Sequence, residues 1–279
     1  MNPSLLLKIS ISGLLSCGTV PGANLLFFGN SFTIQNNVSG KVGLLAEAEG
    51  KTAPLIVADL AGGEDLAYHL GEINDRPNNN LTHSSLAGGN WDFVIIQGYS
   101  TEATSALGDP TAFRANARAI QEAVLNHSPA ATVILFETWA REAGHAYYPG
   151  SFSNPATMQA EIRQNYGLAA QDLTPHGLVG VAPVGDAFEL ANFDSSLYAS
   201  DRYHASPSGS LLASLVLYRT IYGEDVSDIS YTNVSSWAGV NSATWSELVN
   251  LADTVPIPEP APALMGLLGF AFSFRRKRS

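Results

Sequence analysis

Five short apolar runs constrain the fold of this chain more than any other feature. Each run is continuous, as in a strand buried on both faces, whereas a strand with one solvated face alternates apolar and polar residues. Successive runs begin roughly 30 to 45 residues apart, which leaves room for a crossover helix between parallel strands. The runs are LLFF at 25–28, LIVA at 55–58, FVII at 93–96, VILF at 133–136 and LVGVA at 178–182.

The segments between these runs carry helix signals. Asp109-Pro110 is a typical helix start, and apolar residues then recur at helical spacing as far as Val124. Residues 156–172 are a second predicted helix, and Ser206-Pro207 opens a third that Gly223 ends. Alternating strands and helices predict an α/β protein: a three-layer α/β/α sandwich around a five-stranded parallel sheet. Ligand chemistry then belongs at the carboxyl ends of the strands.

The composition excludes several classes of protein. With 279 residues, 46% of them hydrophobic, and one cysteine, the chain is neither disordered, nor collagen-like, nor a disulfide scaffold. Between the two terminal segments, 24 acidic residues outnumber 9 basic ones, a formal net charge of −15. The phosphate backbone of a nucleic acid repels a domain with this negative charge, so we expect no nucleic-acid partner. A neutral or positively charged partner is favoured.

Both ends of the chain carry processing signals. Residues 1–23 hold one lysine, a short apolar stretch and small residues at the end, as in a secretion signal peptide, although a buried first strand or helix is the alternative. Residues 255–279 hold VPIPEP, a 14-residue apolar run and four basic residues. A helix needs about 20 residues to cross a bilayer core, so this segment favours transient membrane association, with a plain C-terminal anchor as the alternative. One folded domain is expected over 24–254.

Ser31, Asp201 and His204 are the candidate catalytic residues. Ser31 follows the first apolar run, where a chain turning from strand to helix exposes a hydroxyl beside backbone N–H groups. Asp201 and His204 precede the third helix, and their spacing lets the carboxylate hold one imidazole nitrogen while the other faces a nucleophile. The alternatives are an ordinary helix cap at Ser31 and a surface aspartate beside a satisfied histidine.

Six segments, in order, resemble the SGNH/GDSL hydrolase superfamily over about residues 24–223. The resemblance implies a flavodoxin-like fold and a serine hydrolase acting on esters without metal or cofactor. It makes Ser31 the nucleophile, His204 the base and Asp201 the partner of that base. The segments are GNSFT, AGGEDL, WDFVIIQGYS, ETWAR, VAPVGDAF and DRYHASPSG.

The same resemblance implies an oxyanion hole, the set of N–H donors that holds the negative oxygen formed during ester cleavage. Its donors would be the N–H of Ser31, a glycine N–H and a side-chain amide. Gly62 and Gly63 are the two glycines, and Gly63 is favoured because it directly precedes Glu64-Asp65, where a helix starts. The family's usual asparagine is missing, and Gln97 stands there with the same amide donor. Loss of one donor costs about 10²–10³ in rate.

Residues after the fourth run are candidates for substrate contact. Trp139 is either an apolar wall for the substrate or a core residue. Arg141, Tyr147 and Tyr148 are candidates for contacting a sugar or an acyl group. The other histidines lack the spacing of a metal site, so no metal is expected.

The C-terminal segment resembles the PEP-CTERM sorting signal of bacteria that build extracellular polysaccharide matrices. That resemblance implies cleavage by an exosortase and a place at the cell surface or in the matrix. The leading hypothesis is therefore an exported ester hydrolase acting through an acyl-enzyme, with an O-acylated polysaccharide as the expected substrate. A non-catalytic matrix or carbohydrate-binding protein on the same fold is the alternative, which the departure at Gln97 favours and the intact set of Ser31, Asp201 and His204 opposes.

Overall fold

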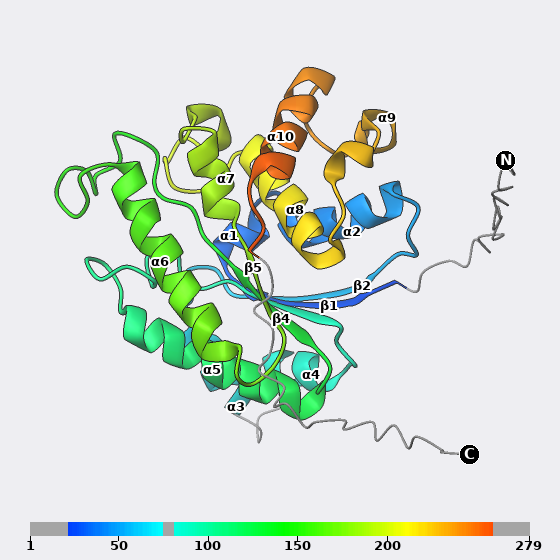
Figure 1. The fold of residues 1–279 in the computed structure, drawn as a ribbon, viewed down its shortest axis with the longest axis vertical. Coiled ribbons are helices and arrows are strands. Elements are labelled where there is room, and N and C mark those ends of the chain that lie inside the picture. Colours follow the sequence, from blue (N-terminus) through cyan, green and yellow to red (C-terminus); the bar gives the residue numbers. More distant parts are fainter. Residues whose placement is uncertain (1–21, 75–80, 259–279) are drawn as a thin grey trace, which may run out of the picture.

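The structure is a computed structural model that describes residues 22–74 and 81–258 (Figure 1). The expected signal peptide at 1–23 and the expected sorting signal at 255–279 lie almost wholly outside the described residues. Within the described ranges, no helix combines the length and the apolar character that crossing a membrane requires.

Five parallel strands form one sheet in the order β2-β1-β3-β4-β5. This is the flavodoxin-like order, and it confirms the predicted fold class. Strand β1 lies between β2 and β3, with Leu25 paired to Ile56 on one side and to Phe93 on the other. The chain reverses its direction of travel across the sheet between β1 and β3, the place where α/β proteins of this kind bind ligands. The strands are β1 (Asn24–Gly29), β2 (Leu55–Leu60), β3 (Phe93–Ile96), β4 (Thr132–Phe136) and β5 (Val179–Ala182).

Strand β2 is less buried than its apolar sequence predicts. Leu25, Leu26 and Val94 on the inner strands have no exposed surface, whereas Leu55 is 53% exposed. The difference follows from the strand order, because β2 is an edge strand with only β1 as a neighbour. A continuous apolar run therefore predicted the strand correctly but not its burial.

Helices cover both faces of the sheet, as predicted. Figure 1 shows α1, α2, α7, α8, α9 and α10 on one side and α3, α4, α5 and α6 on the other. The first group comprises α1 (Ser31–Ile34), α2 (Val38–Ala48), α7 (Val184–Leu190), α8 (Pro207–Tyr222), α9 (Tyr231–Val234) and α10 (Ser242–Thr254). The second comprises α3 (Leu66–Asn74), α4 (Leu81–Ala87), α5 (Pro110–His127) and α6 (Pro155–Leu173). Short 3₁₀ turns are η1 (Gln35–Asn37), η3 (Ser195–Leu197) and η4 (Val226–Asp228).

The three predicted helices begin where their capping residues stand. The Asp109 carboxylate accepts hydrogen bonds from the backbone N–H groups of Thr111 and Ala112 at the start of α5. Ser206 caps α8 in the same way, with proline at the first helical position. Gly223 ends α8 with a positive φ of 67°, a conformation that glycine adopts without strain.

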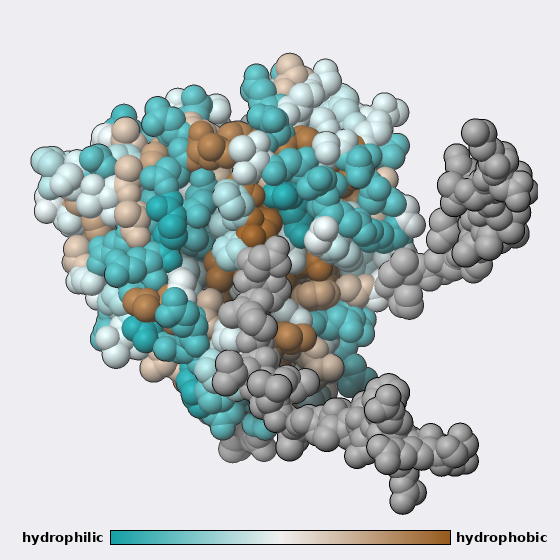
Figure 2. All heavy atoms as spheres, viewed as in Figure 1, coloured by the Kyte–Doolittle hydropathy of each residue, from teal (hydrophilic) through white to brown (hydrophobic). Residues whose placement is uncertain are grey.

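Figure 2 shows the molecule from the same side as Figure 1. Hydrophilic residues cover most of this side, and hydrophobic ones gather in the middle, between the two helical layers. Buried apolar side chains from the sheet and from the helices on both of its faces form the core. The candidate catalytic residues lie in the loops at the carboxyl edge of the sheet.

Candidate active site

Ser31 is the first residue of α1, directly beyond the end of β1. Asn30 adopts an extended conformation and caps the helix, because its Oδ1 accepts a hydrogen bond of 3.2 Å from the N–H of Phe32. The chain therefore turns from strand to helix at Ser31 itself, whose side chain is half-buried. This places Ser31 at the carboxyl edge of the sheet, beyond the paired strands β1 and β3.

Asp201 and His204 are held together in a short loop before α8. An antiparallel bridge between Tyr198 and Ala205 closes the loop, and Arg202 turns the chain with a φ of 61°. The Asp201 Oδ2 lies 2.7 Å from the Nδ1 of His204. Its Oδ1 accepts the backbone N–H groups of Tyr203 and His204 at 3.0 and 2.9 Å. The carboxylate thus fixes both the loop and the imidazole.

These contacts set the protonation of the pair. Desolvation alone would raise the pKa of Asp201, but the hydrogen bonds from the His204 side chain and from the two backbone N–H groups outweigh it and lower that pKa. An ionised Asp201 accepts a hydrogen bond from Nδ1–H and so holds that proton on Nδ1, which leaves the lone pair of the imidazole on Nε2. That Nε2 is buried and has no hydrogen-bond partner among the described residues. His204 can therefore accept a proton.

A stack of aromatic rings joins the serine loop to the histidine loop. Phe32 stacks on Trp139 with the ring centroids 4.1 Å apart, and Phe188 stacks on the other face of Trp139 at 4.7 Å. The Trp139 Nε1 donates to the carbonyl oxygen of Tyr203 at 3.2 Å, and Phe32 meets the ring of His204 edge-on at 5.9 Å. The neighbours of Ser31 in the chain therefore lie directly against His204.

The structure favours a core role for Trp139 over a wall of the substrate pocket. Trp139 has no exposed surface, and Phe32 and Phe188 both stack on its indole. Its position supports the alternative, a core residue, and the core residue here aligns the two loops.

Gly62 and Gly63 lie in an exposed turn beyond the end of β2. The turn is closed by a hydrogen bond of 3.3 Å from the Glu64 N–H to the Ala61 carbonyl oxygen. Gly63 has a φ of 83°, which side-chain-bearing residues rarely adopt, and no atom lies within 4 Å of a Cβ built on either glycine. Neither glycine N–H makes a hydrogen bond to another described residue. Both remain available as donors, with the positive φ adding a reason for glycine at 63.

Gln97 is oriented differently from the prediction. Its side chain is 1% exposed, and its Oε1 accepts the N–H of Asn30 and the hydroxyl of Thr33, each at 3.0 Å. Its Nε2 donates to the Asn30 Oδ1 at 2.9 Å and to the Gly98 carbonyl oxygen. Both N–H groups are in use, so none is left for a substrate oxygen, contrary to the expected third donor. Gln97 instead holds the serine loop against the end of β3.

Sequence reasoning missed a buried carboxyl group at the edge of the site. Glu102 is 8% exposed, and its Oε2 accepts the N–H of Tyr99 at 2.9 Å and that of Leu66 at 3.4 Å. Burial raises its pKa to about 7, against the lowering effect of the Tyr99 hydrogen bond. It connects the start of α3 to the loop after β3. The residues next to Glu102 in the sequence are mostly polar, and they give no sign that its carboxyl group is buried.

Of the three loop residues predicted to contact substrate, two border the site. The Arg141 guanidinium lies 4.1 Å above the ring of Tyr203, next to His204, and 5.5 Å from the ring of Tyr147. The Tyr148 hydroxyl instead donates to the backbone carbonyl oxygen of Arg141 at 3.0 Å. Tyr148 therefore stabilises the loop that carries the other two.

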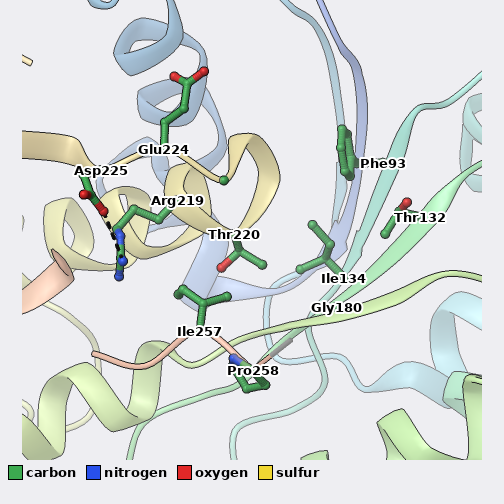
Figure 3. Close-up of a pocket in the computed structure, with 11 residues that line it drawn as sticks. Phe93, Thr132, Ile134, Gly180, Arg219, Thr220, Glu224, Asp225, Ile257 and Pro258 are labelled. Carbon is green, nitrogen blue, oxygen red and sulfur yellow. Dashed lines mark hydrogen bonds and ion pairs between the residues drawn. The ribbon is translucent and has the colours of Figure 1, made fainter. Parts of the chain in front are cut away.

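A separate cavity of about 390 Å³ lies away from these residues (Figure 3). It is lined by Phe93 and Thr132, the first residues of β3 and β4, and by Arg219 in the last turn of α8. The carboxyl edge that carries Ser31 is the opposite edge of the sheet. The cavity therefore takes no part in the arrangement around Ser31 and His204.

Comparison with proteins of known structure identifies the family. A "putative SGNH hydrolase" from Slackia heliotrinireducens is 30% identical in sequence, with a TM-score of 0.58. The match covers 72% of this chain and 99% of that protein. The chain belongs to the SGNH hydrolase family. No protein-family model and no curated protein matches the sequence of this SGNH hydrolase.

More distant structures share the fold of this SGNH hydrolase. A DUF4886 family protein from Bacteroides uniformis has a TM-score of 0.65 at 19% identity, over 83% of this chain and 93% of the other. A variant of an acetyl-xylooligosaccharide esterase from a Geobacillus species has a TM-score of 0.50 at 18% identity, over 73% of this chain and 96% of the other. At such identities the likeness extends to the fold alone.

Proposed function

We propose that the protein is an exported serine hydrolase that cleaves ester bonds with Ser31, His204 and Asp201. One observation carries the proposal: the Asp201 carboxylate holds the Nδ1 of His204 at 2.7 Å, while the buried Nε2 has no partner. This is the state of a histidine ready to act as a general base. Ser31 directly precedes Phe32, whose ring meets that of His204 edge-on at 5.9 Å.

The reaction proceeds through an acyl-enzyme. The Ser31 Oγ attacks the ester carbonyl carbon as His204 Nε2 takes the hydroxyl proton, and Asp201 stabilises the imidazolium through Nδ1–H. The carbon–oxygen bond to the alcohol then breaks, and His204 returns the proton to the departing oxygen. Water then attacks the acyl carbon as His204 takes one of its protons, the bond from that carbon to Ser31 Oγ breaks, and His204 returns the proton to Ser31 Oγ, which releases the acid and restores the enzyme.

Two backbone N–H groups are proposed to hold the negative carbonyl oxygen. They are those of Ser31, at the start of α1, and Gly63, with Gly62 as the alternative at the same turn. Gln97 supports this pair by holding Asn30 and so fixing the turn at Ser31. No side-chain donor is required in the proposal, since the Gln97 amide is occupied.

The proposed substrate is an O-acylated polysaccharide outside the cell. The terminal segments support this, because a secretion signal and a matrix-type sorting signal take the protein to the surface through the action of an exosortase. The acetyl-xylooligosaccharide esterase that shares this fold acts on an acetylated sugar polymer fragment, which makes the same chemistry accessible to the fold. No metal or cofactor enters the proposed reaction.

Covalent labelling tests this function directly. A serine-directed phosphonate should add one group to the protein, and peptide mass spectrometry should place it on Ser31. Ser31→Ala should abolish both the labelling and the hydrolysis of a short-chain aryl acetate, while the unfolding temperature changes little, because the cap of α1 is Asn30 and not Ser31. Asp201→Asn should lose less activity than His204→Ala, since it disturbs the imidazole without removing the base.

The same experiment decides against the proposal in two ways. Unchanged turnover in Ser31→Ala or His204→Ala would remove that residue from the reaction. A protein that neither takes the phosphonate nor cleaves the ester, yet binds polysaccharide, would be the non-catalytic carbohydrate-binding protein. The engaged amide of Gln97 is the observation that favours this second function.

A further inference from the structure

Arg141 is the most unusual charged residue near Ser31. It follows β4 at the carboxyl edge of the sheet and is 2% exposed. Burial lowers the pKa of its guanidinium, which nevertheless stays charged at neutral pH, since arginine does not lose its proton in proteins. A buried charge is unfavourable unless an opposite charge accompanies it.

No carboxylate accompanies this guanidinium within the described residues. Its Nη2 donates to the Ser100 hydroxyl at 2.8 Å, but its Nε and Nη1 have no acceptor. The groups that interact with it electrostatically are the phenols of Tyr203, Tyr147 and Tyr99, and Tyr147 also supports the charge as a side-chain hydrogen-bond partner. These partners are neutral phenols, so the charge of Arg141 has no anion beside it within the described residues.

Other arginines of the same chain provide the comparison. They are more exposed than Arg141, and each lies within 4.0 Å of a carboxylate: Arg114, Arg163, Arg202 and Arg219. Arg118, which is exposed, contacts His176 instead. Among the described arginines, the most buried one is thus left without a carboxylate, while four more exposed ones have one. The missing anion is best supplied by a ligand.

The rings around Arg141 restrict the shape of that anion. The guanidinium stacks on the Tyr203 ring at 4.1 Å, and the Tyr147 and Phe32 rings lie 5.5 and 5.7 Å from its central carbon. The N–H groups of a guanidinium lie in its own plane, and the rings lie against it, so an anion is expected to approach along that plane. A carboxylate is planar and can pair with two N–H groups of a guanidinium at once.

The place of Arg141 connects the anion to the reaction. Phe32 follows Ser31 in the chain, and Tyr203 precedes His204, so Arg141 lies against the neighbours of both catalytic candidates. Tyr147 and Tyr203 are partly exposed, so the rings around Arg141 extend to the surface. We expect the remaining part of a substrate whose acyl group is at Ser31 to reach these rings.

We propose that Arg141 is a substrate-binding residue that recognises a carboxylate on the alcohol part of the ester, as in an acylated uronic acid. The inference rests on the proposed function and narrows its substrate class to acidic sugar esters. Tyr147 and Tyr203 enclose the pair that the carboxylate and the guanidinium form. The acidic surface of the protein repels anions in general, so an arginine without an anionic partner at this one place selects the carboxylate that it fits.

Two sugar esters that differ in one negative charge and one methyl group test the proposal. Tri-O-acetylated methyl glucuronoside is offered as the free acid and as its methyl ester, and acetate release is measured. The unmodified protein should prefer the free acid by about 10- to 100-fold in kcat/KM, as expected for a charge-assisted contact. In Arg141→Gln and Arg141→Lys the ratio should fall towards one. Arg114→Gln is the control: it removes an arginine of α5 that pairs with Asp172 of α6, and it should keep the full ratio.

A second measurement needs no variant and covers the case in which Arg141→Gln does not fold. Sodium glucuronate should slow phosphonate labelling of Ser31 in the unmodified protein, and methyl glucoside should not. Absence of any labelling would be a failure of the proposed function itself. Labelling that glucuronate does not slow, an unmodified protein without preference for the free acid, or an unchanged ratio in both Arg141 variants would each overturn the carboxylate site.

Discussion

At the scale of single residues, one carboxylate organises the base. Asp201 accepts three hydrogen bonds from a stretch of four residues, two of them from backbone N–H groups. The side chain of Asp201 is 48% exposed, so the strength of the pair comes from geometry and not from exclusion of water. A short loop with a left-handed residue at Arg202 therefore suffices to build the Asp–His unit.

The Gln97 side chain gives the residue-scale prediction. Gln97→Ala removes the acceptor for the Asn30 N–H and the Thr33 hydroxyl and leaves a cavity in the serine loop. We expect the free energy of unfolding to fall by about 2–4 kcal/mol, with turnover falling as the loop loses its position. Urea unfolding and ester hydrolysis are measured on the same preparation. Full stability with turnover reduced about 10²-fold would instead make Gln97 the oxyanion donor that the sequence predicted.

Contacts between residues close in the chain were easier to predict than contacts between residues distant in sequence. Asp201 and His204 are close in the chain, so their pairing follows from spacing alone. Gln97 meets Asn30 across 67 residues, and only the alignment of β1 with β3 brings the two together. The ring stack on Trp139 likewise joins three segments that no sequence pattern connects. Residue types therefore indicated the chemistry, while the contacts that position them required the structure.

At the scale of elements, Glu102 couples α3 to the end of β3. Its carboxyl group accepts N–H groups from both, so the turn at Gly63 and the loop after Gln97 share one anchor. The pKa of Glu102, raised by burial to about 7 from an ordinary 4.5, means that the folded protein holds this proton more tightly than the unfolded chain. Its contribution to stability is complete below pH 4.5 and is lost as the pH rises through about 7.

Glu102→Gln should remove this pH dependence. The variant keeps an oxygen for the two N–H groups but cannot ionise, so its stability relative to the unmodified protein should rise between pH 5 and pH 8 by up to about 3 kcal/mol. Urea denaturation across that range measures the difference. Glu122→Gln, at an exposed position of α5, serves as the control and should follow the unmodified protein. Parallel curves for Glu102→Gln and the unmodified protein would mean that Glu102 ionises normally.

Elements were predicted best where burial dictates sequence. All five strands lie at the predicted apolar runs, and α5, α6 and α8 begin at their caps. Helices such as α2 and α10 were not predicted. The buried positions of α2 include the polar residues Ser39 and Lys41, so its sequence shows no clear apolar stripe. Helix α10 lies beyond the last strand, where the alternation of strands and helices has ended. The exposure of β2 depends on strand order, which the runs do not encode.

At the scale of the whole molecule, the last described residues complete the layer built by α8 and α10. Val255 is 2% exposed, and its carbonyl oxygen accepts a hydrogen bond from Arg219 at 3.0 Å. Figure 3 shows Ile257 and Pro258 beside Thr220 and Ile134 at the cavity between α8 and the sheet. The domain expected over 24–254 would end before these contacts. They favour a folded unit that extends to about residue 258.

Two shortened chains test where the folded unit ends. A chain of residues 24–258 should unfold at the temperature of the full chain, because it keeps every contact of the described C-terminal residues. A chain of residues 24–254 loses the burial of Val255 and Ile257 and the acceptor for Arg219, which together contribute about 2–4 kcal/mol. At about 2–4 °C for each kcal/mol in a domain of this size, its unfolding temperature should fall by about 5–15 °C. Val255→Ala in the 24–258 chain should give an intermediate value, since it removes the side chain and keeps the carbonyl oxygen. Equal unfolding temperatures for the two shortened chains would return the boundary to residue 254 and leave Ile257 and Pro258 as part of the processing segment.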